Sequence, residues 1–314
     1  MKKLLLLALS LCLIASPRPA DAAAKSWEEL NSEALAMHAN SRYADALLLA
    51  DESLKAAEEK YGKDDPSAAA SLNTIALIRF SQGKYNDAES NYLRSLAIYK
   101  KSYGDNHLDA AIVCHKLGQL YFQQGKRDEA EQYYKQSLDI YKKLNMDQGL
   151  SAALATNDLA ELYYFTGKIS RAESLYESVL DRFRKTYGGY APETIEPMEK
   201  LYELYFVQRK YADAETLLKE ELEVYDRSYP RNHPHVAKVL GRLAEVYHIE
   251  GKDTESISLY TEVINSDKKN LGPDHPYVAV LLTQLADVYK KMGKTAEAKR
   301  SLDEAAEIRQ KMAR

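Results

Sequence analysis

The sequence is poor in cysteine, tryptophan and long apolar runs, and it has no excess of basic residues. Its 314 residues include two cysteines and one tryptophan, and 43 Lys and Arg side chains stand against 47 Asp and Glu side chains. The formal net charge of −4 disfavours nonspecific binding to nucleic acid, which normally requires a basic surface. Cys114 is the one cysteine after residue 24, so no disulfide can form within that part of the chain.

The longest apolar run covers residues 4–15 and is shorter than the roughly 20 residues that a membrane-spanning helix needs. Two lysines precede it and small residues follow it, which is the pattern of a signal peptide. We expect residues 1–24 to be this signal peptide, cleaved after Ala22 or Ala24. The mature protein is then expected to be periplasmic or secreted, with no segment inserted in a membrane.

The chain contains a gapless repeat with a period of 42 residues, marked by glycine, tyrosine and alanine. Ser41 and Arg209 take the two grid positions that lack glycine, and seven units fit into residues 25–314. A fixed period of this length indicates a repeat protein rather than one or two globular domains. The columns are Gly83, Gly125, Gly167, Gly251 and Gly293; Tyr121, Tyr163, Tyr205, Tyr247 and Tyr289; and Ala46, Ala88, Ala130, Ala172, Ala214 and Ala298.

Each unit is predicted to form two antiparallel helices, because apolar residues recur at helical spacing on both sides of the turn glycine. Sustained two-residue alternation and the hairpin-turn dipeptides Asn-Gly and Asp-Gly are missing from the sequence, so we expect an all-α fold. Further columns of glycine and proline are predicted to end the second helices and to begin the first ones. These columns are Gly62, Gly104, Gly188 and Gly272, and Pro66, Pro192, Pro234 and Pro276.

One helix pair cannot bury its apolar face alone, so we expect the pairs to stack into an α-solenoid with a concave surface. Pro197 falls inside a predicted first helix, which should therefore begin late or bend. Arg309 replaces a tyrosine of earlier units, and the last unit is expected to cap the array.

The spacing of Leu117, Gly118 and Tyr121, followed by Ala130 and Tyr134, resembles the tetratricopeptide repeat (TPR) motif. The repeat length and the linkers at residues 232–234 and 274–276 resemble the kinesin light chain subtype of that family. The resemblance implies a right-handed superhelix of helical hairpins that binds proteins, although this fold serves many unrelated partners.

Catalytic and metal-binding constellations are not indicated. His233 and His235 are interpreted as repeat linker residues rather than as metal ligands, and Cys114 as a buried apolar residue. Adjacent carboxylates such as Glu220 and Glu221 are expected on the solvated surface. We therefore expect a non-enzymatic protein without metal or cofactor.

The first helix of each unit should line the concave groove and bind the partner. Two columns are polar, a third is largely acidic and a fourth is largely aromatic, a combination that suits a peptide groove. The predicted groove residues are Asn73, His115, Asn157, Lys116, Lys200, Arg242, Gln119, Glu161, Glu203, Glu245, Phe80, Phe122, Tyr164 and Phe206.

Two structural alternatives remain open for these columns. Lys200 could pair with Glu203, and Arg242 with Glu245, because each pair lies three residues apart on one helix. The aromatic column could instead be core between repeats.

In kinesin light chain relatives, asparagine and basic residues of these columns are implied to hold acidic peptides. The acidic stripe here departs from that pattern and favours a partner of basic or mixed charge.

The predicted function is a scaffold that binds a protein or peptide outside the cytoplasm. The alternatives are an enzyme or accessory subunit of helical-repeat architecture, and a structural protein that assembles with itself.

Overall fold

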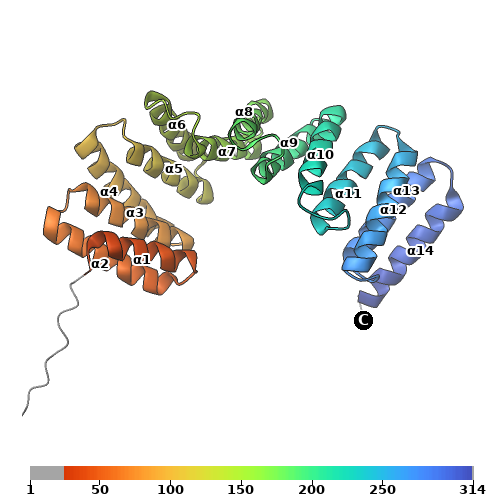
Figure 1. The fold of residues 1–314 in the computed structure, drawn as a ribbon, viewed down its shortest axis with the longest axis horizontal. Helices are drawn as coiled ribbons and strands as arrows, with labels where there is room; N and C mark the ends of the chain where they lie inside the picture. The colour runs from red at the N-terminus through yellow and green to blue at the C-terminus, as the bar shows by residue number, and fades with distance from the viewer. Residues whose placement is uncertain (1–24, 313–314) are drawn as a thin grey trace, which may run out of the picture. The chain divides into compact units, whose positions relative to one another are not determined.

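The computed structural model describes residues 25–312, so the predicted signal peptide over residues 1–24 lies outside the described residues. Within that range the chain forms fourteen α-helices and one short 3₁₀ helix, and it has no strand (Figure 1). The all-α prediction is confirmed. The chain divides into two compact units, unit 1 (Met1–Gly104) and unit 2 (Asp105–Arg314).

Unit 1 holds two helical hairpins, in which α1 pairs with α2 and α3 with α4 (Figure 1). The helix α3 also packs against α2, so the second hairpin covers the apolar side of the first. The helices are α1 (Trp27–Ala39), α2 (Tyr43–Tyr61), α3 (Pro66–Ser81) and α4 (Tyr85–Tyr103).

Unit 2 continues the same pattern, with each helix packed against the next along the chain. Its helices are α5 (Leu108–Gln123), α6 (Arg127–Lys143), α7 (Leu150–Phe165), α8 (Ile169–Tyr187), η1 (Pro192–Thr194), α9 (Ile195–Val207), α10 (Tyr211–Asp226), α11 (Pro234–Ile249), α12 (Asp253–Asn270), α13 (Pro276–Lys291) and α14 (Thr295–Met312).

The turn within each hairpin has a left-handed residue at the predicted grid position. Gly83 has φ of 73°, and the backbone N–H of Lys84 donates to the carbonyl of Arg79 at 2.9 Å, which closes the end of α3. The same conformation is imposed on Arg209, which has φ of 60° although it carries a side chain. The turn geometry therefore belongs to the repeat, and glycine is the residue that adopts it without strain.

The N-termini of four first helices are capped by the linker residue that precedes them. Asp65 accepts a hydrogen bond from the backbone N–H of Ser67 at 2.9 Å. At the corresponding positions, Nδ1 of His107, His233 and His275 accepts from the backbone N–H two residues later, at 3.2 to 3.3 Å. The histidines of the linkers are thus helix caps, which agrees with their interpretation as repeat residues.

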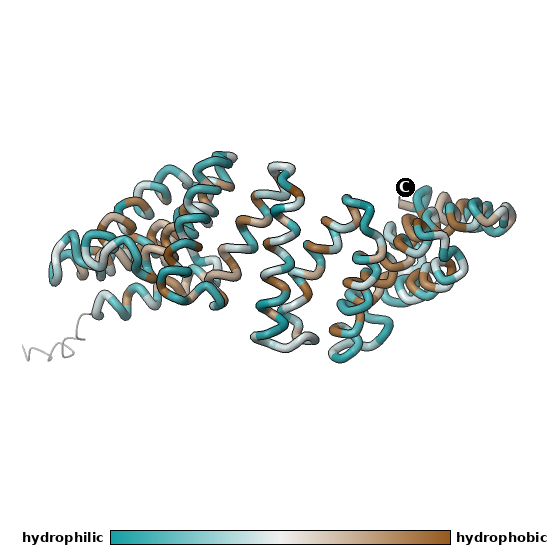
Figure 2. Tube along the Cα trace, turned by 90° about the horizontal axis from the view of Figure 1, so that it is seen from above, coloured by the Kyte–Doolittle hydropathy of each residue, from teal (hydrophilic) through white to brown (hydrophobic). Residues whose placement is uncertain are grey.

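The core of each unit lies between neighbouring helices, and hydrophobic and hydrophilic residues alternate along them in Figure 2. The alanine column is fully buried, as at Ala88, Ala130 and Ala172, and lets the two helices of a hairpin approach closely. Large aromatic side chains such as Tyr134 and Tyr176 fill the space beside it. Among the described residues, no helix combines the length and apolar character needed to cross a membrane.

The irregular helix predicted around Pro197 does begin late. Pro192 starts the short 3₁₀ helix η1, and α9 begins only at Ile195. Pro197 then lies in the first turn of α9, where its missing N–H removes no helical hydrogen bond.

Candidate functional site

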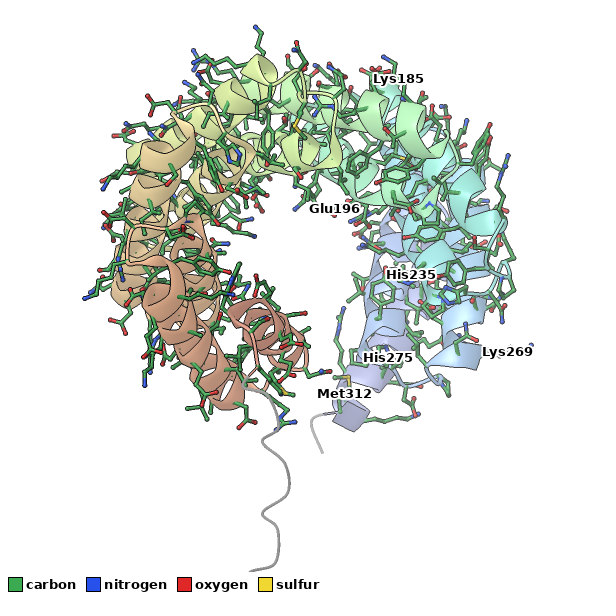
Figure 3. The ribbon with its side chains drawn as sticks, turned by 60° about the vertical axis from the view of Figure 1, so that its left-hand side comes forward. Lys185, Glu196, His235, Lys269, His275 and Met312 are labelled. Carbon is green, nitrogen blue, oxygen red and sulfur yellow. The ribbon has the colours of Figure 1, made fainter. Side chains whose placement is uncertain are left out.

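In unit 2, the helix α9 lies on the inner side, whereas α8 and α12 lie on the outer side (Figure 3). Figure 3 shows Glu196 of α9 pointing to the inner side, whereas Lys185 of α8 and Lys269 of α12 lie on the outer side. The predicted groove columns belong to the odd-numbered helices, since each was taken from the first helix of a hairpin.

The predicted groove residues are divided between the two units. Asn73 and Phe80 belong to unit 1, and the remaining ones belong to unit 2. His115 is buried and the others are intermediate in exposure, so these side chains line the surface without projecting from it. The side-chain oxygens Oδ1 of Asn73 and Asn157 are buried and have no hydrogen-bond partner among the described residues.

A polar network joins α5 to α7 on the inner side. Asp158 Oδ2 lies 2.7 Å from His115 Nε2 and accepts a hydrogen bond from Gln119 Nε2 at 2.7 Å. Lys116 Nζ in turn donates to Gln119 Oε1 at 3.2 Å. Burial lowers the pKa of Lys116, and the carboxylate of Asp158 opposes this shift. The network brings predicted residues of one helix onto an acid of the next.

Side chains of α7, α8 and α9 enclose a small pocket of about 80 Å³. Four predicted groove residues line this pocket, namely Glu161, Tyr164, Lys200 and Glu203. Phe165 and Tyr176 also line it, although the sequence did not indicate them. Burial raises the pKa of Glu161, and the negative charges of Asp158 and Glu196 raise it further. Lys200 lowers this pKa in part, because its Nζ lies 3.9 Å from Glu161 Oε1. Negative charge therefore exceeds positive charge around this pocket. We call Asp158, Glu161, Glu196, Glu203 and Glu245 the acidic inner surface.

The cations of the inner face reach back to the preceding hairpin. Lys200 approaches Glu161 of α7, and Arg242 Nη1 lies 3.4 Å from Glu199 Oε1 of α9. Lys238 Nζ donates to the same Glu199 oxygen at 2.6 Å. These contacts show that Lys200 and Arg242 approach carboxylates of the preceding repeat. Pairing within one helix, with Glu203 and Glu245, was the alternative that the sequence had left open. Glu245 is left with a pKa that burial raises and that Arg242 and His248 only partly lower.

The aromatic column packs mainly within its own hairpins. Phe80 lies 5.7 Å from Tyr85 and Phe206 lies 5.7 Å from Tyr211, measured between ring centroids, and each pair joins the two helices of one hairpin. Phe122 instead contacts Phe165 of the next repeat at 5.7 Å. Phe165 is 60% exposed, so it is the ring of this group that a partner can reach most easily.

The expectation that Glu221 is a solvated surface residue is wrong. Glu221 of α10 is 1% exposed, and neither of its carboxylate oxygens has a hydrogen-bond partner among the described residues. Burial raises its pKa to about 7; Glu199 adds to the shift, and Arg242 and Lys238 oppose it. The reason is register, because position 221 falls in the column of Ser95, Ser137, Val179 and Val263, which packs inward.

The residues considered for metal binding or nucleophilic chemistry pack against aromatic rings or lie in the core. The ring centroids of His233 and Tyr229 lie 4.0 Å apart, and His235 stacks on Tyr225 at 5.3 Å. Cys114 is fully buried in α5, as predicted for an apolar column. Within residues 25–312, no group of three or more His, Cys, Asp or Glu side chains is placed to hold a metal ion.

One interaction between repeats was missed. Glu131 of α6 binds Lys168 at 2.7 Å and Lys135 at 2.6 Å, and it accepts a hydrogen bond from Tyr163 Oη at 3.0 Å. Burial opposes ionisation, but these three hydrogen bonds outweigh it and lower the pKa of Glu131 to about 2. The signal was available in the sequence, because Glu131, Glu173 and Glu215 and the paired Lys168, Lys210 and Lys252 all follow the 42-residue period.

Comparison with solved structures gives several relatives of the same fold. A putative kinesin light chain of Podosopora anserina with nearly identical TPR-like repeats is 24% identical, with a TM-score of 0.57, over 66% of this chain and 99% of that chain. BtubC (BKLC) of P. vanneervenii is 18% identical, with a TM-score of 0.51, over 92% of this chain and 93% of that one. The C-terminal part of a TPR repeat-containing protein of Cytophaga hutchinsonii is 15% identical, with a TM-score of 0.65, over 88% and 94%.

The comparison with curated proteins found no match. The family model "Tetratricopeptide repeat" matches residues 29–101, 67–143, 151–227, 198–269 and 235–311, which together cover most of the chain. With the helical hairpins described above, this match identifies the fold as a TPR solenoid. The chain therefore belongs to the tetratricopeptide repeat family.

Proposed function

We propose that unit 2 binds a protein segment of basic or mixed charge along its inner face. The TPR fold is a scaffold typical of protein–protein interaction. The observation that carries the proposal is the surplus of carboxylates on the acidic inner surface, where Glu161 and Glu245 both have raised pKa values. A basic side chain placed there would relieve this unfavourable burial of negative charge.

The neighbouring aromatic residues supply the apolar part of the proposed interface. Tyr164 and Phe165 line the same pocket as Glu161 and Glu203. Aromatic side chains bury a large area at small entropic cost, whereas the charges set the orientation and the association rate. A segment that alternates basic and apolar residues fits this arrangement.

Selection from a library of random peptides displayed on phage tests the charge preference without knowledge of the natural partner. We expect the immobilised full chain to enrich peptides that contain Lys and Arg over those that contain Asp and Glu. A selected peptide should bind more weakly at high ionic strength, as measured by fluorescence anisotropy.

The double variant Glu161→Gln, Glu203→Gln should weaken binding of a selected peptide by about tenfold or more, because hydrogen bonds to charged groups contribute about 1.5–3 kcal/mol each. The matched control is Glu223→Gln, an exposed residue of α10, which should leave binding unchanged. Enrichment of acidic peptides, or equal affinity of the double variant, would refute the proposal.

The location of the protein outside the cytoplasm is a further part of the proposal, and it rests on the signal-peptide pattern of residues 1–24. Fractionation of cells that produce the full chain, followed by mass spectrometry of the mature N-terminus, tests it. Recovery of the uncleaved chain from the cytoplasm would contradict it.

A further inference from the structure

A second pocket on unit 2 lies between α11, α12 and α13 and has a volume of about 430 Å³. That volume is within the range of about 300–1,000 Å³ typical of ligand sites. Its apolar walls include Ala237, Leu271 and the ring of Tyr277, and its polar groups are Lys238, Arg242 and Asp267. Tyr277 is 37% exposed, so one wall of the pocket borders solvent.

The pocket arises where the repeat loses an aromatic ring. Asp267 occupies a column that holds Tyr99, Tyr141, Phe183 and Tyr225 in the four preceding hairpins. Those rings fill the space beside the first helices, and a carboxylate is much smaller. The helix opposite also carries a small residue, since Gly241 stands where other units have Glu199, Asn157 or His115. A Cβ at position 241 would lie 3.6 Å from Tyr277 Oη.

Asp267 is an unsatisfied acid at this pocket. It is 2% exposed, and its Oδ2 has no hydrogen-bond partner among the described residues. Burial raises its pKa, and His275 only partly opposes this. A buried carboxylate oxygen without a hydrogen-bond partner is costly, which indicates that a donor is missing.

The cations beside the pocket are already engaged. Lys238 Nζ and Arg242 Nη1 both contact Glu199 of α9, and the Arg242 guanidinium lies over the ring of Tyr202 at 4.9 Å. Both cations therefore already have an anionic partner on α9, although they line the same pocket as Asp267 of α12. Asp267 Oδ2 is left without a hydrogen-bond partner among the described residues, beside Tyr277, whose pKa is raised by burial and by Asp267.

We propose that this pocket receives one lysine or arginine side chain of the protein partner, with its cation at Asp267 Oδ2 and its aliphatic stem against Ala237, Leu271 and Tyr277. Outward rotation of the partly exposed Tyr277 side chain admits it. This inference rests on the proposed function, since it assigns one basic residue of the same partner to a second, separate position on unit 2.

The test uses small probes that report on this pocket alone. The full chain is labelled with ¹³C at alanine methyl groups, and the Ala237 resonance, assigned with Ala237→Gly, is titrated with Nα-acetyl-lysine amide. The control probe is Nα-acetyl-norleucine amide, which keeps the aliphatic stem and lacks the ammonium group. We expect the lysine amide, and Nα-acetyl-arginine amide titrated in the same way, to bind about tenfold or more tightly than the norleucine amide.

Variants of Asp267 separate the site from a general effect on folding. Asp267→Asn keeps the shape and should remove most of the preference for lysine. Asp267→Tyr restores the ring found in the preceding hairpins, so it should abolish binding and raise the melting temperature. Equal binding of lysine and norleucine amides, stronger binding of Nα-acetyl-glutamate amide, or an unchanged lysine preference in the well-folded Asp267→Asn variant would overturn the inference.

The double variant Glu161→Gln, Glu203→Gln makes failure of this inference distinguishable from failure of the proposed function. It should leave binding of the lysine amide at Ala237 unchanged. Loss of this signal in the double variant would show that the probe reads the acidic inner surface, and it would also overturn the inference. If the pocket binds lysine amide while peptide selection shows no preference for basic residues, the proposed function alone fails.

Discussion

The buried carboxylate of Glu221 should make the stability of the α9–α11 segment depend on pH near neutrality. The groups that face it are Glu199 of α9 and Arg242 and Lys238 of α11. Burial is the largest influence, and it raises the pKa from 4.5 to about 7 in the folded chain. Glu221 therefore binds its proton more tightly when folded than when unfolded, and protonation favours the folded state.

The direction and size of the effect follow from these two pKa values. Stability should be highest below about pH 4.5 as far as this group is concerned, should fall as the pH rises through about 7, and should level off above that. One pKa unit corresponds to about 1.4 kcal/mol, so ionised Glu221 costs the folded chain about 3 kcal/mol at alkaline pH. This is a large part of the stability of an ordinary domain.

Hydrogen exchange measured by mass spectrometry is the suitable assay, because repeat proteins unfold locally and each hairpin depends mainly on its neighbours. Glu221→Gln should slow exchange in peptides from α10 relative to the wild type at about pH 8, and the difference should shrink toward about pH 5 after correction for the intrinsic exchange rate.

The control for this experiment is Glu223→Gln, which removes an exposed carboxylate from the same helix and should leave the pH profile of exchange unchanged. If the Glu221→Gln variant and the wild type keep a constant difference from acid to alkaline pH, Glu221 is not a strongly shifted buried acid and the reasoning fails.

Four further substitutions test the turns, the caps and the bridges between repeats. Arg209→Gly should raise the free energy of unfolding by about 1 kcal/mol in thermal denaturation, because Arg209 has a left-handed backbone. Gly167→Ala should lower the free energy of unfolding by a similar amount, because it places a side chain on a left-handed backbone. If either variant unfolds at the same temperature as the wild type, this account of the turns is contradicted. Asp65→Ala removes the acceptor for the Ser67 N–H and should cost about 1 kcal/mol in urea denaturation, whereas equal stability would show that the cap contributes nothing. Glu131→Gln should lower the melting temperature of the chain at neutral pH, because the folded state holds Glu131 in its ionised form with a lowered pKa. The difference in melting temperature from the wild type should disappear as the pH falls from about 4.5 through about 2. A difference that persists in acid would show that the charge of Glu131 is not its cause.

The fold could be predicted from the sequence because residues at fixed positions of the repeat mark where each helix begins and ends. Glycine at the grid position, proline at the start of a first helix and alanine between paired helices each have one physical reason, and their period is constant. The irregular hairpin was predicted to begin late or to bend because of Pro197, and α9 begins late. The N-cap role of the linker histidines was not predicted, because histidine is not among the preferred capping residues.

The candidate site was predicted less completely than the fold. The structure brings Glu161, Lys200 and Glu203, which belong to neighbouring columns of the predicted groove, to one pocket. The columns did not indicate that Tyr176 of an outer helix reaches the same pocket, because contacts between the two helices of a hairpin depend on side-chain length and helix crossing. The burial of Glu221 could not be predicted from its acidic neighbour Glu220. It follows only when Glu221 is compared with the residues at the same position of the other repeats.

The unusual acids of the core lie on α10 and α12, which both pack against α11. Glu221 of α10 and Asp267 of α12 each replace a residue that suits the core better. Both carboxylate oxygens of Glu221 and the Oδ2 of Asp267 have no hydrogen-bond partner among the described residues. In a repeat protein the cost of such a residue falls on its own hairpin and the adjacent ones, so the rest of the array can maintain the fold. A binding position can therefore be placed where the repeat is locally weakened. On this reasoning, α10 to α13 are where a partner that supplies positive charge would stabilise unit 2 most.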